Sequence, residues 1–282
     1  MSIPRLSIAL GRTSRTEALF SGAVASPGLA LDFAEIAPIS RAFAPMVRER
    51  RYEASEMAIA TFLMAKAAGK DLVLLPVVLA ARFQEAALLC RDAAPIHGPA
   101  DLAGRRVGVR AYSQTTGLWL RGAIAETAGV AADAMQWVTF EGAHVAEYRD
   151  PPWVGRAAPG EDMLAMLRDG RLDAAIFGND MPAAEGLRTV FPDAEAAGAA
   201  FGARHGFMPV NHLLTIRGDV ARNRPQDVAE LVRLLGASGA AVSDRATLEP
   251  AIACAIRYAV AQRLLAAPLS LDAVWSAASF AG

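Results

Sequence analysis

The chain has 282 residues, of which 54% are hydrophobic and 20% are charged, and its formal net charge is -1. This composition excludes a disordered chain, and a nucleic-acid-binding protein is disfavoured because no excess of cations is available to neutralise phosphates. No stretch approaches the uninterrupted apolar run, about 18 residues or more, of a membrane span. The two cysteines, Cys90 and Cys254, lie in apolar runs and are expected to be buried, unreactive thiols.

The first ninety residues are expected to alternate short apolar strands with helices. The expected strands are Leu6–Leu10, Leu29–Phe33 and Asp71–Leu79, and the expected helices are Ile39–Arg51 and Met57–Ala68. The last strand is almost continuously apolar, which is typical of a sheet covered on both faces. Gly69 is expected to end the second helix, since glycine readily adopts the left-handed conformation found there.

The apolar pattern of the chain is interrupted at 92–99, a stretch that contains proline and glycine and is expected to be a linker. A second α/β unit follows, and 141–160 is expected to be a surface excursion. Its expected elements are the strands Val107–Val109, Trp137–Phe140 and Leu172–Phe177, and helices ending near Ala128 and Arg168. The chain is then expected to return through the strand Pro209–Ile216 to the helices Pro225–Leu235, Leu248–Leu265 and Leu271–Ala278.

Alternating strands and helices predict an α/β protein with mostly parallel sheets flanked by helices. Because the first unit is interrupted and later resumed, we expect two lobes joined by two crossing segments, with a cleft between them. The expected lobes are 1–92 with 213–282, and 93–212.

Three polar turns follow apolar strands in this sequence: Gly11–Thr16, Ser55-Glu56 and Tyr112–Thr116. The start of a helix leaves unpaired N–H groups and a partial positive charge, so such turns together favour a cleft that binds a small anion. The alternative to ligand binding is that these polar residues only cap the N-termini of helices. The residues expected to touch a ligand are Ser55, Tyr112, Ser113, Gln114, Thr115, Thr116 and Asn179.

Arginines at strand ends could supply the remaining positive charge. Arg12 and Arg82 each follow a buried strand directly, and Arg110 ends the strand Val107–Val109. A guanidinium holds a carboxylate through two parallel hydrogen bonds, which favours these three as a clamp, although most arginines are ordinary surface residues.

The four histidines show no spacing typical of a metal site, so no metal is expected. His212 precedes an apolar run and could either move a proton or complete a hydrogen bond at the start of a strand. No glycine-rich phosphate-binding motif and no nucleophile elbow occur, which disfavours nucleotide binding and acyl hydrolysis.

Several segments carry a resemblance to the 4,5-dihydroxyphthalate decarboxylase family. They are 54–57, 101–109, Trp119-Leu120-Arg121-Gly122 and 206–212. The stretch 167–175 is similar to a sequence pattern found widely in type II periplasmic-binding-protein folds. The resemblance implies that fold and loss of carbon dioxide from a dihydroxylated benzene dicarboxylate, without an organic cofactor. Under it, Arg12, Arg82 and the turn 113–116 would hold a carboxylate, and His212 or Glu56 would move a proton.

The sequence departs from the family pattern after Arg82-Phe83, where Gln84-Glu85 stand, and at Arg110, where proline is common. Two hypotheses therefore stand: a carbon–carbon lyase, and a non-catalytic substrate-binding protein of a transporter or sensor. Without a recognisable secretion signal the chain is expected in the cytoplasm, or in the periplasm if such a signal has been removed. The expected partner is a small aromatic carboxylate, and a homodimer is left open.

Overall fold

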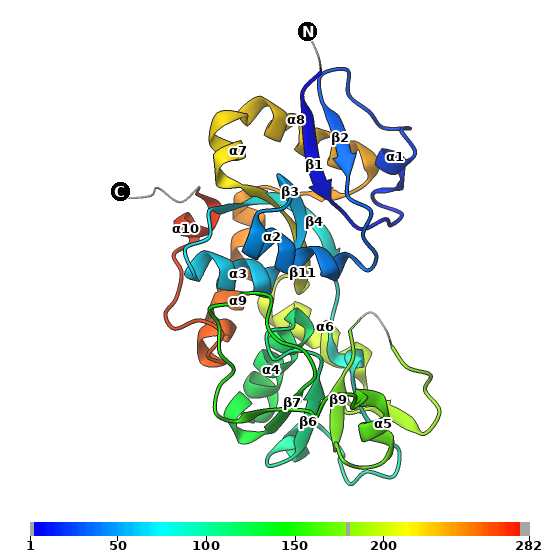
Figure 1. Ribbon diagram of the computed structural model, residues 1–282. Coiled ribbons are helices and arrows are strands. Elements are labelled where there is room, and N and C mark those ends of the chain that lie inside the picture. The colour runs from blue at the N-terminus through cyan, green and yellow to red at the C-terminus, as the bar shows by residue number, and fades with distance from the viewer. Residues whose placement is uncertain (1–2, 179–180, 277–282) are drawn as a thin grey trace.

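The computed structural model describes residues 3–178 and 181–276. Its described strands form two six-stranded sheets, one in each of two lobes that lie one above the other in Figure 1. In order across the first sheet, the strands are β12 (Ala241–Val242), β4 (Leu72–Ala81), β11 (Val210–Arg217), β3 (Ala54–Ala58), β1 (Arg5–Ala9) and β2 (Ala30–Phe33). Across the second sheet they are β10 (Leu187–Thr189), β5 (Leu88–Arg91), β9 (Ala174–Ile176), β6 (Arg106–Val109), β7 (Gln136–Thr139) and β8 (Val154–Arg156).

Helices flank both sheets, as the α/β pattern predicted. Those of the first lobe are α1 (Glu17–Phe20), α2 (Phe43–Glu49), α3 (Ile59–Ala67), α7 (Gly218–Asn223) and α8 (Pro225–Ser238). Those of the second are α4 (Thr115–Ala128), α5 (Met163–Arg168) and α6 (Ala194–His205), and the chain ends with α9 (Arg245–Ala261) and α10 (Leu271–Trp275). Short 3₁₀ turns occur at Ile39–Ala42, Glu85–Ala87, Pro99–Leu102 and Ala132–Ala134.

Both sheets are mixed, and in each of them most strands run in one direction, as the sequence predicted. Strands β2, β1 and β3 are parallel, as are β9, β6, β7 and β8, while β11 and β5 run antiparallel to their neighbours. The reason is the path of the chain. A strand that arrives from the other lobe enters its sheet on the side where the carboxyl ends of the parallel strands lie. It therefore has to run in the direction opposite to theirs.

The two crossings lie between β4 and β5 and between α6 and β11. Because β5 pairs in the second sheet and β11 already begins at Val210, both crossings fall earlier in the chain than the expected limits at 92 and 212. Hydrogen bonds join the two crossings: the buried side-chain amide of Gln84 donates to Asn211 Oδ1 at 2.7 Å, and the backbone N–H of Arg82 donates to the Pro209 carbonyl at 3.0 Å. Gln84, where the sequence departs from the family pattern, thus connects the crossings.

Residues 54–58 form a strand, although Ala54-Ser55-Glu56 was expected to open a helix. All five residues of β3 are buried, and the strand pairs with β1 on one side and β11 on the other. Pairing on both edges satisfies the backbone groups of this segment, which outweighs the helical preference of alanine, glutamate and methionine. The helix α3 begins only at Ile59.

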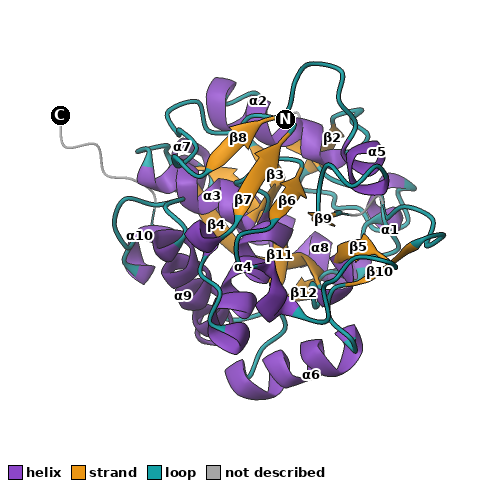
Figure 2. Ribbon diagram, turned by 90° about the horizontal axis from the view of Figure 1, so that it is seen from below, coloured by secondary structure: helices purple, strands orange, loops and turns teal. Residues whose placement is uncertain are grey.

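Two parts of the second lobe also differ from what the sequence predicted. The excursion after Glu141 contributes β8 to the edge of the sheet, and helix α6 was not predicted. Helix α6 consists largely of alanine and glycine, with Phe201 among its few buried large side chains, so its hydrophobic periodicity is weak. In Figure 2, which views this lobe from below, β8, β7, β6 and β9 lie side by side and α6 lies apart from them.

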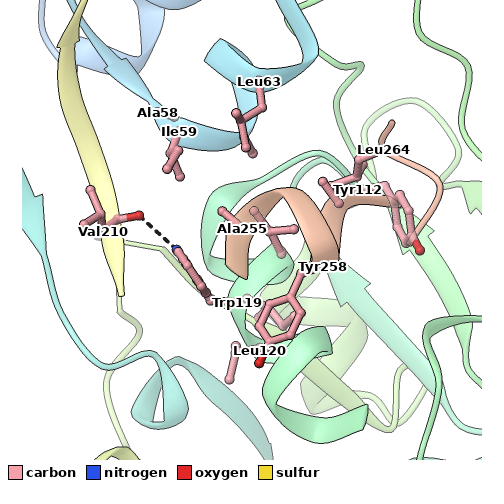
Figure 3. Close-up of a cluster of buried hydrophobic side chains, with 14 of the residues drawn as sticks. Ala58, Ile59, Leu63, Tyr112, Trp119, Leu120, Val210, Ala255, Tyr258 and Leu264 are labelled. Atoms are coloured by element: carbon pink, nitrogen blue, oxygen red, sulfur yellow. Dashed lines mark hydrogen bonds between the residues drawn. The ribbon is translucent and has the colours of Figure 1, made fainter. Parts of the chain in front are cut away.

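One continuous group of buried apolar side chains spans the boundary between the lobes. Ile59 and Leu63 of α3, Trp119 of α4 and Tyr258 of α9 belong to it, as Figure 3 shows. The indole N–H of Trp119 donates to the carbonyl of Val210 at 2.9 Å, so helix α4 is bonded directly to a crossing segment. Helix α9 contacts both α3 and α4. The lobes are therefore joined by packed side chains as well as by the two crossings.

Gly122 makes this packing possible. A Cβ atom added at Gly122 would lie 2.1 Å from the ring of Tyr258, far inside van der Waals contact. The segment Trp119-Leu120-Arg121-Gly122, noted in the sequence, thus builds the interface between α4 and α9. Cys90 and Cys254 are free and buried, as expected, and burial raises the pKa of both thiols.

Candidate functional site

Two ionisable residues predicted as catalytic lie against each other in the first sheet. Glu56 of β3 and His212 of β11 are on neighbouring antiparallel strands, and Glu56 Oε1 lies 2.6 Å from His212 Nδ1. The other carboxylate oxygen accepts the N–H of Gly11 at 2.9 Å, just beyond the end of β1. With both oxygens engaged, the carboxylate holds the imidazole in one orientation.

The remaining ring nitrogen of His212 is available for chemistry. Glu56 is buried, whereas the His212 side chain retains 16% of its exposure, and no described residue hydrogen bonds to its Nε2. A carboxylate on Nδ1 selects the tautomer and stabilises the imidazolium formed when Nε2 takes up a proton. The pair is therefore suited to moving a proton at Nε2.

The start of α3, next to this pair, faces the start of α4 from the other lobe. The N–H of Ala60 donates to Thr115 Oγ1 at 3.3 Å, and Ser113, Thr115 and Thr116 are buried. Two helix N-termini, with their unpaired N–H groups and partial positive charges, thus meet where the lobes touch. Gly11 contacts Glu56, and Thr115 contacts the start of α3; residues 55–56, expected to be a turn before a helix, lie in strand β3.

The three arginines expected to form a clamp have different surroundings. Arg12 is exposed and pairs with Glu17 at 2.6 Å. Arg110 lies 3.4 Å from Glu141. Arg82 follows β4, whose Ala80 is the register partner of His212, and its guanidinium has no ion pair or hydrogen bond with any described residue. Burial without a counter-ion lowers the pKa of Arg82.

Some predicted ligand-binding residues are occupied within the protein. Ser55 is fully buried and its hydroxyl donates to the Glu56 carbonyl at 2.7 Å, so its hydroxyl already has a partner inside the sheet. The hydroxyl of Tyr112 accepts the indole N–H of Trp153 at 3.1 Å, and its ring lies under the guanidinium of Arg121 at 4.0 Å.

Gln114 is the N-cap residue of α4, and its amide nitrogen packs closely against Gly178, at the end of β9. Its amide oxygen is buried and has no hydrogen-bond partner among the described residues. Asn179, which was also expected to bind ligand, lies outside the described residues.

Three residues near the pair were not predicted from the sequence: Phe43, Thr61 and His144. The ring of Phe43 contacts the imidazole of His212 edge-on, with ring centroids 5.3 Å apart, and it contacts that of His144 in the same way at 5.6 Å. Thr61 Oγ1 lies 2.9 Å from His144 Nδ1. No local signal marks these residues, because Phe43 and Thr61 read as helix core and His144 lies in the excursion.

Burial and two cations set the charge of His144. Desolvation, with smaller contributions from Arg110 and Arg48, lowers the pKa of His144 to about 4. Its imidazole is therefore neutral at physiological pH, and it can donate or accept a hydrogen bond without carrying charge.

Two cavities lie away from this pair of residues. One of about 360 Å³ lies between α4 and α6, with Glu85 and Phe201 in its wall, and one of about 330 Å³ lies along α9 and the following loop. Among the described residues, no group of three or more histidine, cysteine or acidic side chains is arranged to hold a metal ion. No helix in the described part of the chain is long and apolar enough to cross a membrane.

Two mixed sheets in separate lobes, two crossings and helix N-termini meeting between the lobes define a two-lobed type II periplasmic-binding-protein fold. Solved structures agree. The aliphatic sulphonate binding protein SsuA of Escherichia coli matches 97% of this chain and 82% of its own at a TM-score of 0.56 and 15% identity. The desulfurization enzyme DSZB matches 97% and 96% at a TM-score of 0.53 and 18% identity. Both a binding protein and an enzyme thus share this fold.

In sequence, the chain is similar to 4,5-dihydroxyphthalate decarboxylases. It is 28% identical over 254 residues to that of Comamonas testosteroni, a match covering 83% of this chain and 74% of the relative. It is 29% identical over 179 residues to that of Pseudomonas putida, covering 61% and 69%. No family model matches the chain.

Proposed function

We propose that the protein is a carbon–carbon lyase that removes carbon dioxide from a dihydroxylated aromatic dicarboxylate such as 4,5-dihydroxyphthalate. The observation that carries this proposal is the pair formed by Glu56 and His212, whose free Nε2 is suited to proton transfer. Two curated relatives named for this activity support the choice of reaction.

The reaction replaces a carboxylate by a proton on a ring carbon. In 4,5-dihydroxyphthalate each carboxylate stands para to a hydroxyl. Electron donation from that hydroxyl lets the ring carbon take a proton from the imidazolium of His212, which gives a dienone-like intermediate. The bond to the carboxylate then breaks, its electron pair restores the aromatic ring, and carbon dioxide leaves. Glu56 stabilises the imidazolium before it gives up its proton.

The carboxylate that stays on the ring needs a cationic partner. Arg82 is half-buried and without a carboxylate partner among the described residues, so a substrate carboxylate would relieve its unpaired charge. The N-termini of α3 and α4 would add backbone dipoles on the same side of the ligand. In this proposal Arg82, rather than Arg12, is the principal anchor.

The direct test is incubation of the purified protein with 4,5-dihydroxyphthalate, with protocatechuate followed by liquid chromatography and carbon dioxide by a coupled assay. We expect both products in equal amounts from the wild-type protein and neither from His212→Asn. His205→Asn is the matched control, because that histidine, at the end of α6, pairs with Glu126 of α4 instead of with the catalytic pair. Tight binding without any product would overturn the lyase.

The second candidate is a non-catalytic binding protein for a small carboxylate. The unpaired Arg82 favours it equally, since an anion-binding group serves both functions. The packed boundary between the lobes favours the lyase instead, because binding proteins of this architecture open and close about a hinge. Calorimetric titration alongside the turnover assay separates the two candidates.

A further inference from the structure

The excursion after β7 carries part of the second lobe across to the first. Arg48 of α2 donates to the carbonyls of His144 at 2.7 Å and Ala143 at 2.8 Å, and the ammonium of Lys70 lies 2.5 Å from Glu147 Oε1. Both cations belong to the first lobe. The loop is therefore held against the lobe that contains the catalytic pair by two hydrogen bonds to its backbone and one ion pair.

The loop places His144 against Phe43, a residue that His212 also contacts. Both imidazoles meet the ring of Phe43 edge-on, at interplanar angles of 85° and 87°, so one phenyl ring connects the two. Each has its Nδ1 occupied, one by the hydroxyl of Thr61 and the other by the carboxylate of Glu56. Each leaves its Nε2 without a hydrogen bond to a described residue.

The two partners give the imidazoles different chemistry. A carboxylate stabilises a proton on His212, whereas the Thr61 hydroxyl is neutral and can either donate to or accept from Nδ1 of His144. Burial and the nearby cations keep His144 uncharged. A neutral imidazole carries one N–H donor and one acceptor nitrogen, so it can bind a phenolic hydroxyl in either direction.

We propose that His144 is a substrate-binding residue, contributed by the second lobe, that hydrogen bonds through Nε2 to a ring hydroxyl of the aromatic acid and selects hydroxylated rings over unsubstituted ones. The inference rests on the proposed function for the identity of the ligand. It assigns the three sites of the ligand to three groups: a carboxylate to Arg82, the ring carbon to His212 and a hydroxyl to His144. A site built to bond a hydroxyl discriminates strongly against an analogue that lacks it.

The test is calorimetric titration with 4,5-dihydroxyphthalate and with phthalate, which differ only in the two hydroxyls. We expect the wild-type protein to prefer the dihydroxylated acid by roughly tenfold or more. His144→Asn keeps a polar group at the position of Nδ1 but lacks Nε2, so it should lose this preference while its affinity for phthalate stays unchanged. His144→Gln, whose amide reaches the position of Nε2, should recover part of it.

Two further variants separate recognition from structure. Thr61→Val removes the partner of Nδ1 and should reduce the preference less than His144→Asn does, because the imidazole remains in place. His205→Asn should change nothing. An unchanged preference in His144→Asn, or an equal loss of affinity for both acids, would overturn the proposal.

Turnover and preference fail independently in this design. If the wild-type protein prefers the dihydroxylated acid but releases no carbon dioxide, the proposed lyase activity is rejected. The proposed role of His144 then still stands. If the wild-type protein releases carbon dioxide and His144→Asn keeps the same preference, the proposed role of His144 is rejected. The proposed lyase activity then still stands. If the wild-type protein binds neither acid, both are rejected.

Discussion

The boundary between the two lobes has an apolar part and a polar part. In the apolar part, Trp119 of α4 and Tyr258 of α9 pack against α3 and are almost completely buried. In the polar part, both carboxylate oxygens of Glu56 have protein partners, whereas His212 and His144 each use Nδ1 for a protein contact and leave Nε2 without a hydrogen bond to a described residue. The first part fixes the distance between the lobes, so the second can hold its polar groups in place before a ligand arrives.

The largest expected effect comes from breaking the polar part at the pair itself. Glu56→Gln and His212→Asn should each lower kcat by roughly 10²- to 10⁴-fold, the usual contribution of a positioned acid–base group. Binding of 4,5-dihydroxyphthalate, measured by calorimetry, should persist. The double variant should be no slower than the worse single one, because the two residues act as a unit. Additive losses would mean that they act separately.

A second prediction concerns the effect of pH on stability. The pKa of His144 falls from 6.5 to about 4 on folding, so above pH 6.5 both states are neutral and the contribution of this residue to stability is fully present. As the pH falls from 6.5 to 4, the unfolded chain binds a proton that the folded protein refuses. Stability should then decrease, by up to about 3 kcal/mol from this residue.

Urea unfolding at pH 7.5 and pH 5 measures that loss. His144→Asn should show a smaller difference between the two pH values than the wild-type protein. His97→Asn, at an exposed histidine, should keep the wild-type difference. Equal pH dependence in wild type and His144→Asn would contradict the burial of a neutral imidazole.

Arginine substitutions compare an unpaired cation with a paired one. Arg82→Gln should weaken binding of the dicarboxylate roughly 10- to 100-fold, the value of hydrogen bonds to a charged group. Arg12→Gln should leave the affinity unchanged, because the Arg12 side chain already pairs with Glu17 at the surface. A larger loss in Arg12→Gln than in Arg82→Gln would return the anchoring role to Arg12.

The smallest expected effect is on the apolar part, at Gly122. Alanine is favoured over glycine in a helix by about 1 kcal/mol, but its Cβ would overlap the buried ring of Tyr258. Overpacking costs about 1–3 kcal/mol, so Gly122→Ala should lower the melting temperature slightly. With Tyr258→Ala already in place, which removes the clashing ring atoms, the same change should raise it. Stabilisation by Gly122→Ala alone would mean that this interface is loosely packed.

The sequence predicted the parts of the fold that follow from local patterns. Continuous apolar runs located β4 and the centre of β11, and glycines marked the ends of α3 and α4. The discontinuous order of the units predicted two lobes. What local patterns missed were segments whose structure depends on pairing. One is β3, expected as the start of a helix, and the other is β5, which was not predicted as a strand and whose residues were expected within the first lobe.

The candidate site divides in the same way. Glu56 and His212 were named as proton-transfer candidates through the family resemblance, and His212 also because it precedes an apolar run; the structure brings the two together. Arg12 and Arg82 looked alike in sequence, since each follows a strand, and only their neighbours distinguish them. His144 could not be identified, because its position depends on a loop that crosses to the other lobe.

By itself, then, the sequence determined the class of fold, the two lobes and the residue types available at the strand ends. These follow from hydrophobic periodicity and turn residues, which act over a few positions. The tertiary structure alone decided the directions of β5 and β11, the lack of a counter-ion for Arg82 among the described residues, and the buried, neutral imidazole of His144. Each of these depends on contacts between residues far apart in the chain, and burial and charge are properties of those contacts.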